Sequence, residues 1–448
     1  MSDQPSSTGQ PLPDGSSHPS NGRSQTPYWH PFANMANVSR SEFVVVSGRG
    51  CEVTDSSGRT YLDATAALWF CNVGYGRSEI VDAVARQLTR LPAYSTFGPY
   101  TTDTTLEAAG EIAQRAPFPD AAVFLTSGGS DAVETAAKLV RSYWSAMGQP
   151  HRRVIVGRPR AYHGMHAYGT SLAGIAANRE TFGDMVPEVA HVHEDSVASV
   201  QREFERFGPE NVGAFIGEPV IGAGGVVPPP DGYWTGVAEL CRRHEILLIS
   251  DEVISGFGRL GYGFGCERYG FTPDLITFAK GVTSGYMPLG GVIASQRVKD
   301  PFWEGEGRWF RHGYTYSGHA GACAAALANL QIIDSEGLGK RVQRLEPVLA
   351  EAARGLLDHP LVGEVRVAGL LCAVDLAADA VAANEGLATE LVLACREQGV
   401  LTRALGQAGV QISPAFVIEP EQIERIFDSL RKSLDALRQP AASATAAP

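Results

Sequence analysis

Two charged side chains come shortly after apolar runs in the middle of the chain. Asp251 follows the run Ile246–Ile249, and Lys280 follows the run Leu275–Phe278. Both runs are short and do not alternate with polar residues, which is typical of parallel strands buried on both faces. Ligands of open α/β sheets bind beyond the carboxyl ends of the strands. The sequence therefore predicts a carboxylate and a primary amine at one edge of one sheet.

An acid and a lysine at such an edge can serve pyridoxal 5'-phosphate (PLP). The lysine holds this cofactor as a Schiff base, and the acid lies beside the pyridinium nitrogen. The carboxylate keeps the nitrogen protonated, so the ring can accept electrons from a substrate carbanion. Asp251 and Lys280 are thus the candidate catalytic residues. Taken alone, the pair is equally compatible with a buried structural ion pair.

A glycine- and serine-rich turn supplies a candidate phosphate site. The short strand Val123–Leu125 runs into TSGGS, and a helix follows from about Ala132. The N-terminus of a helix binds anions through its backbone N–H groups and its dipole. The sequence has no GxxxxGK[ST] motif, so we do not interpret the turn as a nucleotide P-loop. Gly129 and Ser130 suit the PLP phosphate, although such turns also precede helices that bind nothing.

A second polar segment follows the strand Val154–Val156 and contains the sequence RAYHG. Tyr162 can stack there on a planar ring, or it can be an ordinary loop aromatic. The nearby histidines form pairs without a third ligand at a recognisable spacing, so we expect no metal site. These histidines are His163 with His166 and His191 with His193.

The order of the elements predicts the fold class. Alternating strands and helices over residues 80–330 predict one large α/β domain with a mostly parallel central sheet. Residues 331–440 predict a smaller α+β domain, and residues 27–79 an N-terminal segment of short strands that packs with it. Residues 1–26 and 441–448 are poor in large apolar side chains, so we expect disordered tails.

Composition excludes several classes of function. The 448 residues are 44% hydrophobic and 19% charged, as expected for a soluble globular enzyme with a large core. The net charge of −12 and the lack of a basic cluster argue against a nucleic-acid partner. No apolar run reaches the roughly 20 residues that span a bilayer, and no secretory h-region begins the chain. The seven scattered cysteines contain no CxxC, which predicts reduced thiols in the cytoplasm.

In combination, the motifs resemble one known family over about residues 28 to 438. The chain resembles the class III (fold type I) PLP-dependent aminotransferases, and within them the ω-transaminases or amine–pyruvate transaminases. The motifs occur in family order: SGGSDAVETAAKL, AYHG, GEPVIGAGG, SDEVISGFGR, FAKGVTSGYMPLGG and HGYTYSGHA.

This resemblance implies a role for each residue at the cofactor. It makes Lys280 the Schiff-base lysine and Asp251 the partner of the pyridine nitrogen. The remaining implied cofactor-binding residues are Gly129 and Ser130 at the phosphate, Tyr162 and Val253 on the two ring faces, Glu218, and Thr315. In the family, the threonine matched by Thr315 reaches the phosphate of the other subunit. The resemblance therefore implies a homodimer, or a dimer of dimers, with active sites at the interface.

The resemblance also implies a substrate pocket. Trp69, Phe97 and Ala223 match pocket positions, and Arg403 matches a mobile arginine that pairs with a substrate carboxylate. Some positions depart from the family pattern near the phosphate and this pocket. They are Gly128 in place of Ser or Asn, Ala320 in place of Pro, and the stretch Gly98-Pro99-Tyr100. PLP binding remains the expectation, whereas the choice of substrate stays open.

The implied reaction is a ping-pong transamination. An amine or ω-amino acid gives its amino group, pyridoxamine phosphate forms, and a keto acid such as pyruvate accepts the group. Lys280, once freed, acts as the general base. Alternatives within the family are diamine, β-alanine or 7,8-diaminopelargonate aminotransferases. Beyond these remain a PLP aminomutase or racemase, and a PLP-binding regulator or carrier without turnover.

Overall fold

The computed structural model describes residues 26–38, 42–183, 185–305 and 307–438. Both predicted tails lie outside the described residues, apart from residue 26. The chain forms two compact units. The small unit reaches Ser47 and includes Thr54–Arg59, and the large unit is formed by Gly48–Val53 and the chain from Thr60 onwards. The small unit contains helix α1 (Met35–Val38). The predicted domain boundaries stay predictions.

A seven-stranded sheet forms the centre of the large unit, with strand order β4-β10-β9-β8-β7-β5-β6. All strands run in one direction except β10, which is antiparallel to both of its neighbours. The strands are β4 (Ala122–Thr126), β5 (Val154–Gly157), β6 (Val189–His191), β7 (Val212–Gly217), β8 (Leu247–Asp251), β9 (Leu275–Phe278) and β10 (Gly290–Ala294). This sheet confirms the predicted α/β class. Every residue of β8 and β9 is buried, as their uniform apolar sequence predicts.

The reversed strand β10 begins with two glycines that allow close packing. A Cβ on Gly290 would lie 2.6 Å from the carbonyl oxygen of Gly128, and one on Gly291 would lie 2.5 Å from that of Phe124. Both obstacles are backbone atoms, so they cannot rotate away. The missing side chains therefore let the turn after β4 approach the strand that leads to Lys280.

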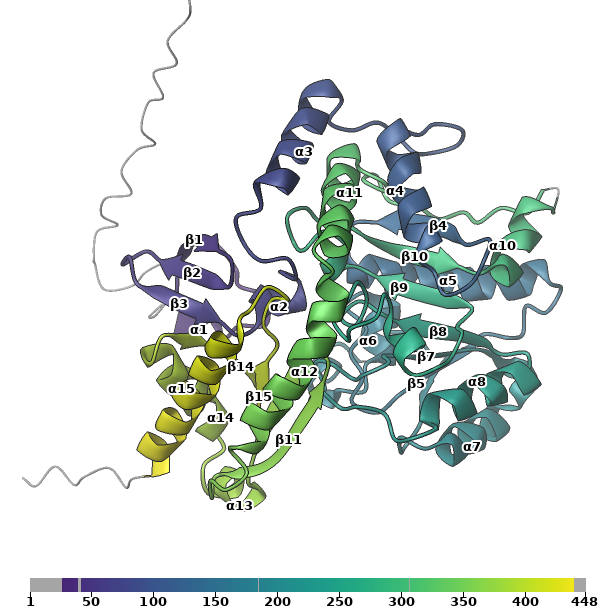
Figure 1. The fold of residues 1–448 in the computed structure, drawn as a ribbon. Helices are drawn as coiled ribbons and strands as arrows, with labels where there is room; N and C mark the ends of the chain where they lie inside the picture. The colour runs from purple at the N-terminus through teal and green to yellow at the C-terminus, as the bar shows by residue number, and fades with distance from the viewer. Residues whose placement is uncertain (1–25, 39–41, 184, 306, 439–448) are drawn as a thin grey trace, which may run out of the picture. The chain divides into compact units, whose positions relative to one another are not determined.

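Helices cover this sheet, and Figure 1 shows α5 lying along it. Helix α5 buries the small and apolar stripe that the sequence predicts, from Ala132 to Trp144. The alanine-rich α11 packs against α3 and α4, where its small side chains permit close contact. The helices up to this point are α3 (Ser78–Arg90), α4 (Asp103–Gln114), α5 (Gly129–Ala146), α6 (Ala167–Leu172), α7 (Val197–Phe207), α8 (Tyr233–Arg243), α9 (Gly265–Arg268), α10 (Gln296–Trp303) and α11 (Ala320–Ser335). Short 3-10 turns are η1 (Ala176–Asn178), η2 (Pro209–Asn211) and η3 (Lys280–Val282).

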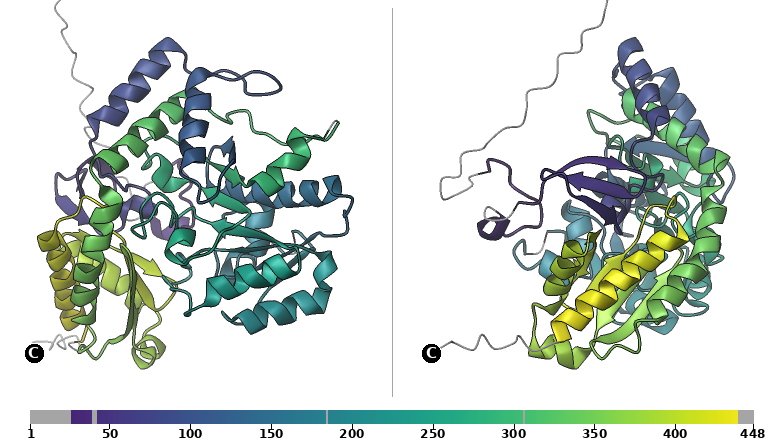
Figure 2. Two further views of the ribbon diagram at one scale, coloured as in Figure 1. Left: turned by 45° about the vertical axis from the view of Figure 1, so that its right-hand side comes forward. Right: turned by 60° about the vertical axis from the view of Figure 1, so that its left-hand side comes forward.

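The C-terminal part is built on a four-stranded antiparallel sheet of order β11-β12-β15-β14. Its strands are β11 (Val362–Ala368), β12 (Leu371–Leu376), β14 (Arg403–Leu405) and β15 (Gly409–Ile412). Helices α12 and α15 lie side by side, as the views of Figure 2 show. The helices are α12 (Leu338–Arg354), α13 (Ala378–Ala383), α14 (Leu387–Glu397) and α15 (Pro420–Arg438). The final helix begins at Pro420, and proline is favoured at the first position of a helix.

Short strands occur near the N-terminus, as predicted: β1 (Val45–Arg49), β2 (Glu52–Asp55) and β3 (Thr60–Asp63). Strand β3 pairs in parallel with β13 (Val400–Leu401), which places Asp63 opposite Leu401. Helix α2 (Ala66–Trp69) follows directly. The end of β3 therefore lies beside the chain that leads into Arg403. None of the described helices is long and apolar enough to cross a membrane.

Candidate active site

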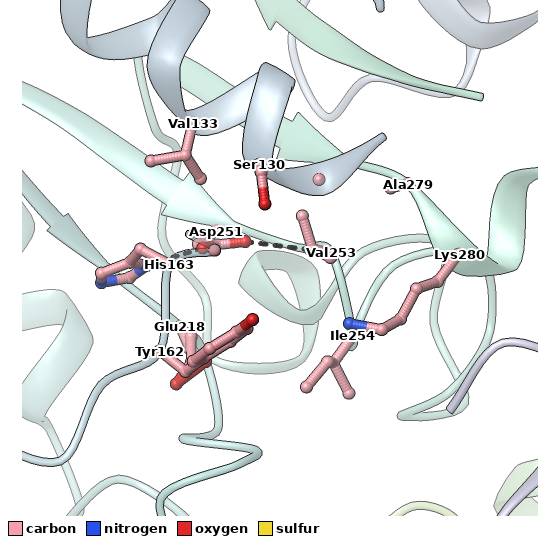
Figure 3. Close-up of a pocket in the computed structure, with 12 residues that line it drawn as sticks. Ser130, Val133, Tyr162, His163, Glu218, Asp251, Val253, Ile254, Ala279 and Lys280 are labelled. Carbon is pink, nitrogen blue, oxygen red and sulfur yellow. Dashed lines mark hydrogen bonds and ion pairs between the residues drawn. The ribbon is translucent and has the colours of Figure 1, made fainter. Parts of the chain in front are cut away.

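One cavity of about 160 Å³ opens at the carboxyl edge of the parallel strands. Seven of the residues predicted from the sequence line it: Gly129, Ser130, Tyr162, Glu218, Asp251, Val253 and Lys280. They come from the ends of β5, β7, β8 and β9 and from the start of α5. Figure 3 shows the lysine amine and the Asp251 carboxylate on the borders of the same space. The sheet edge thus brings together residues that are up to 151 positions apart.

Lys280 supplies the nucleophilic group of the cavity. It is the first residue after β9 and Ala279, and its φ of 43° is in the left-handed region. Burial lowers the pKa of its amine to about 8, and the positive charge of Arg403 acts in the same direction. The carboxylates of Asp251 and Glu218 oppose this shift. A much larger fraction of this amine is therefore neutral near pH 7 than of an ordinary lysine.

Asp251 is held by hydrogen bonds on both of its oxygens. Its Oδ1 accepts from the Val253 N–H at 3.1 Å and from the Thr277 hydroxyl at 3.0 Å. Its Oδ2 lies 2.6 Å from Nδ1 of His163. Such a network fixes the direction of a carboxylate in the cavity before any ligand binds.

His163 is a site residue that the sequence analysis considered only as a metal ligand. The side chain is buried, and its Nε2 has no hydrogen-bond partner in the described structure. No cluster of three metal-binding side chains occurs among the described residues. The signal that could have identified His163 was its position directly after Tyr162 at the end of a buried strand. The cavity also includes Val133, Gly164, Ile254 and Ala279, which lie within the family motifs but had no predicted role.

Glu218 adds a titratable acid to the cavity. Burial raises the pKa of its carboxyl to about 7, and the nearby Asp251 carboxylate adds to this effect. The His163 ring and Arg158 oppose the shift. Glu218 therefore carries a proton for part of the time near neutral pH.

The first turn of α5 forms the anion-binding end of the cavity. Ser130 Oγ accepts a hydrogen bond from the Met165 N–H at 3.1 Å, which leaves the hydroxyl hydrogen available to a ligand. Gly129 is required for space, because a Cβ there would lie 2.9 Å from Cγ1 of Val253. Backbone N–H groups at the start of an 18-residue helix attract a negatively charged group.

Two of the four predicted pocket residues, Trp69 and Arg403, lie near Lys280, and a third, Ala223, packs near Trp69. The Trp69 ring lies 5.7 Å from the lysine Nζ and 5.1 Å from Cζ of Arg403. Ala223 packs against the apolar cluster that contains Trp69. An aromatic surface and a guanidinium therefore stand near the amine, and Ala223 belongs to the apolar surroundings of that aromatic ring.

The single chain does not bring Phe97 or Thr315 to this cavity. Phe97 lines a separate groove of about 830 Å³ together with Trp309 and Phe310. Thr315 is exposed on the loop that precedes α11. Neither residue is among those that line the lysine cavity.

A profile of the family described as aminotransferase class-III matches residues 34–434, which is most of the chain. The chain belongs to the class III aminotransferases. This aminotransferase is 38% identical to the putrescine–pyruvate aminotransferase of Pseudomonas aeruginosa over 428 residues, which cover 90% of this chain and 93% of that relative.

Solved structures are similar to this aminotransferase over nearly its whole length. An (S)-enantioselective ω-transaminase from Thermomicrobium roseum is 38% identical with a TM-score of 0.88, over 92% of this chain and 96% of that one. A PLP-bound amine transaminase from an uncultivated Pseudomonas species is 34% identical with a TM-score of 0.87, over 92% of this chain and 99% of that one.

The cofactor of this aminotransferase is PLP, as for the class III family. The residues of the cavity fit this group. An amine with a lowered pKa suits the aldehyde, and a carboxylate fixed by three hydrogen bonds suits the ring nitrogen. The start of α5 and the free donor of Ser130 suit the phosphate.

Proposed function

We propose that this aminotransferase moves an amino group from an amine or ω-amino acid to a keto acid such as pyruvate, by a ping-pong mechanism. The observation that carries the proposal is that residues for the chemistry and residues for substrate recognition lie around the same lysine amine. Lys280 and Asp251 line it, and Trp69 and Arg403 stand beside the lysine amine. The first pair serves the chemistry that all substrates share, and the second pair serves recognition of two unlike substrates.

When bound, PLP supplies an aldehyde for the substrate amine and a ring that accepts electrons. In the proposal, Lys280 binds the cofactor between turnovers. Once displaced by the substrate amine, it takes the proton from the substrate carbon as general base. An amine whose pKa is lowered to about 8 suits this role, because it is neutral in a useful fraction of molecules. Asp251 stabilises the positive charge on the ring nitrogen, and His163 and Thr277 hold its carboxylate in place.

Arg403 is the proposed partner of the keto-acid carboxylate. A guanidinium binds a carboxylate through two parallel hydrogen bonds. In the described state, the group lies over the Trp69 ring, where cation–π attraction can hold it when no carboxylate is present. An apolar amine then meets Trp69 and the small side chain of Ala223. One pocket thus accommodates both substrates by movement of a single long side chain.

A diamine donor is the second candidate, favoured by the 38% identity to a putrescine–pyruvate aminotransferase. A second ammonium group needs an acceptor at the far end of the pocket, where Arg403 places a positive charge. A β-alanine donor does not meet this difficulty, because its carboxylate can pair with the same arginine. A 7,8-diaminopelargonate donor remains a further alternative.

We further propose that the active unit is a homodimer, or a dimer of dimers, to which each chain contributes Thr315 and Phe97. Both residues are exposed, and neither lines the cavity of its own chain. Large aromatic side chains surround them on the surface, including Trp309 at 69% and Tyr316 at 67% exposure. Apolar surface of this kind is typical of an interface. All seven cysteines are free and buried, which suits the proposed cytoplasmic location.

An amine-donor screen against pyruvate tests the proposal, with alanine formation as the measurement. Donors should include a phenylalkylamine, β-alanine and putrescine, and Lys280→Ala provides the inactive control. Alanine formation from at least one donor supports transamination, and the ranking of donors separates the candidates. Rearrangement or racemisation of an amino acid without consumption of pyruvate would indicate an aminomutase or racemase. PLP binding without turnover of any donor would indicate a regulator or carrier.

A further inference from the structure

The turn that carries Trp69 has an unusual backbone. Ala66, Ala67 and Trp69 have φ values of 46°, 57° and 61°, although none of them is glycine. L-residues rarely adopt this left-handed region, because the Cβ atom approaches the neighbouring carbonyl group. Three such residues within four positions persist only where the surroundings fix them, and such strain is concentrated at functional sites.

One buried carboxylate provides this fixation. Asp63 Oδ1 accepts from the Thr65 N–H at 2.9 Å and from the Thr65 hydroxyl at 2.7 Å. Its Oδ2 accepts from the Ala67 N–H at 2.7 Å and from the Tyr75 hydroxyl at 2.7 Å. The Asp63 side chain thus binds the first part of the strained segment, at Thr65 and Ala67, with three short hydrogen bonds, and the Tyr75 hydroxyl adds a fourth.

No hydrogen bond fixes the position of the Trp69 ring in the described part of the chain. It is buried, but its indole Nε1 has no hydrogen-bond partner in the described part of the chain. The ring is therefore placed by its backbone and by apolar packing, and the backbone is the part that Asp63 holds.

Asp63 also lies beside β13, the strand that precedes Arg403. It pairs with Leu401 in the β3–β13 register, and the Ala64 N–H donates to the Leu401 carbonyl at 3.0 Å. The segments that carry Trp69 and Arg403 thus leave the paired ends of β3 and β13, and the two side chains contact each other near Lys280.

We propose that Asp63 is a positioning residue that sets the Trp69 ring, and through it the substrate side of the lysine cavity. Asp63 acts through the 65–69 turn rather than by touching the substrate. The kinetic part of the test rests on the proposed transaminase function, and the spectroscopic part does not.

The variant Asp63→Asn keeps the size of the side chain and replaces one acceptor oxygen by an N–H₂ group. One backbone N–H of the turn, that of Thr65 or of Ala67, then faces a donor instead of an acceptor, so the turn should relax. With the PLP-loaded enzyme, we expect KM for an apolar amine to rise roughly tenfold while kcat changes by less than about threefold. In the Trp69→Ala background, the same substitution should leave KM unchanged, because a positioning effect disappears with the group it positions. An equal rise of KM in both backgrounds would overturn the proposal.

Near-ultraviolet circular dichroism gives a measurement that needs no turnover. The spectrum of the parent minus that of Trp69→Phe isolates the signal of the Trp69 ring. Asp63→Asn should lose this signal, so that its spectrum matches that of Asp63→Asn/Trp69→Phe. Persistence of the Trp69 signal in Asp63→Asn would overturn the proposal. If the parent enzyme transaminates no donor, the proposed function is wrong. The circular dichroism comparison still decides whether Asp63 positions the Trp69 ring.

A buried carboxylate elsewhere separates positioning from stability. Glu203 in α7 is buried and bonded to Arg206, far from the cavity in the fold. Glu203→Gln should lower the unfolding temperature without changing KM or the Trp69 signal. If Asp63→Asn does not fold, Thr65→Ala removes one of the four hydrogen bonds and should change both measurements in the same direction by a smaller amount. No change in either measurement for Thr65→Ala would then overturn the proposal.

Discussion

His163 Nδ1 lies 2.6 Å from Asp251 Oδ2, and both side chains are buried beside the lysine cavity. This contact adds a histidine to the pair of residues on which the chemistry depends. A hydrogen bond from this position fixes the orientation of the carboxylate.

The first prediction concerns His163 as the donor to Asp251. His163→Leu removes the donor, and we expect kcat/KM to fall by about tenfold, the scale of one hydrogen bond to a charged group. His163→Asn places an amide N–H near the former Nδ1 and should recover most of this loss. Steady-state kinetics on the two variants measures the difference. Equal losses in both would show that His163 fills space rather than donates.

The second prediction concerns Asp251 itself. Asp251→Asn keeps the size of the side chain and removes its negative charge. We expect PLP to remain bound, with a rate loss on the order of 10²-fold or more, as for removal of a principal electrostatic interaction. PLP absorbance establishes binding, and single-turnover kinetics measures the rate. Turnover close to that of the parent would make the acid structural.

The third prediction concerns the lowered pKa of Lys280. At pH 8 about half of its amines should be neutral, whereas a lysine with an ordinary pKa of 10.5 is almost fully protonated there. In the PLP-free protein, pulse acetylation of Lys280 should therefore rise through about pH 8, with Lys299 followed in the same digest as a control. A midpoint near 10.5 for Lys280 would contradict the shift. After addition of PLP and borohydride, the pyridoxyl group should map to Lys280 and be absent from Lys280→Ala.

The fourth prediction concerns the shared site. If Thr315 serves the partner's cavity, a mixture of Lys280→Ala and Thr315→Ala chains contains heterodimers with one intact site. Random mixing makes about half of the dimers mixed, so activity should recover to roughly a quarter of that of the parent. The measurement is activity after joint unfolding and refolding, with each variant refolded alone as the control. No recovery, or an active monomer in sedimentation, would argue that Thr315 acts within its own chain.

The fifth prediction concerns Arg403. Arg403→Ala should raise KM for pyruvate by about 10- to 150-fold, the effect of losing roughly 1.5–3 kcal/mol of a charge-assisted pair. The half-reaction with an apolar amine should change little. Arg160→Ala, which removes an arginine paired only loosely with Asp195 at 4.0 Å, is the matched control. Equal losses for both substrates would assign Arg403 to the fold, and no loss would place the carboxylate elsewhere.

Much of this site could be predicted because its residues end buried strands. The runs before Asp251 and Lys280 are too apolar to be anything but interior strands, and parallel strands share one carboxyl edge. Helix α5 was equally evident, since its apolar residues recur at helical spacing after the glycine- and serine-rich turn. Local patterns of this kind need no knowledge of distant parts of the chain.

Other features depend on register and could not be predicted. The His163–Asp251 contact joins residues 88 positions apart and exists because β7 lies between β5 and β8. Nothing in the short run of β10 indicates its reversed direction. Helix α4 was not predicted, because its threonine-rich start resembles a loop. The turn at Trp69 has left-handed residues that are bonded to the Asp63 carboxylate, which lies before the turn. The backbone preferences of the turn's own residues do not indicate such a conformation.

The glycine pair at the start of β10 bears on how such an enzyme can be diversified. At Gly290 and Gly291, even alanine would meet fixed backbone atoms of the two neighbouring strands. A saturation library should therefore show both positions depleted of every other amino acid, although neither lines the cavity. Changes in substrate range are then expected at the proposed substrate-recognition residues Trp69, Ala223 and Arg403 instead. Substitutions are thus excluded at the two glycines that pack behind the phosphate turn and Lys280, whereas the residues proposed to recognise the substrate can vary.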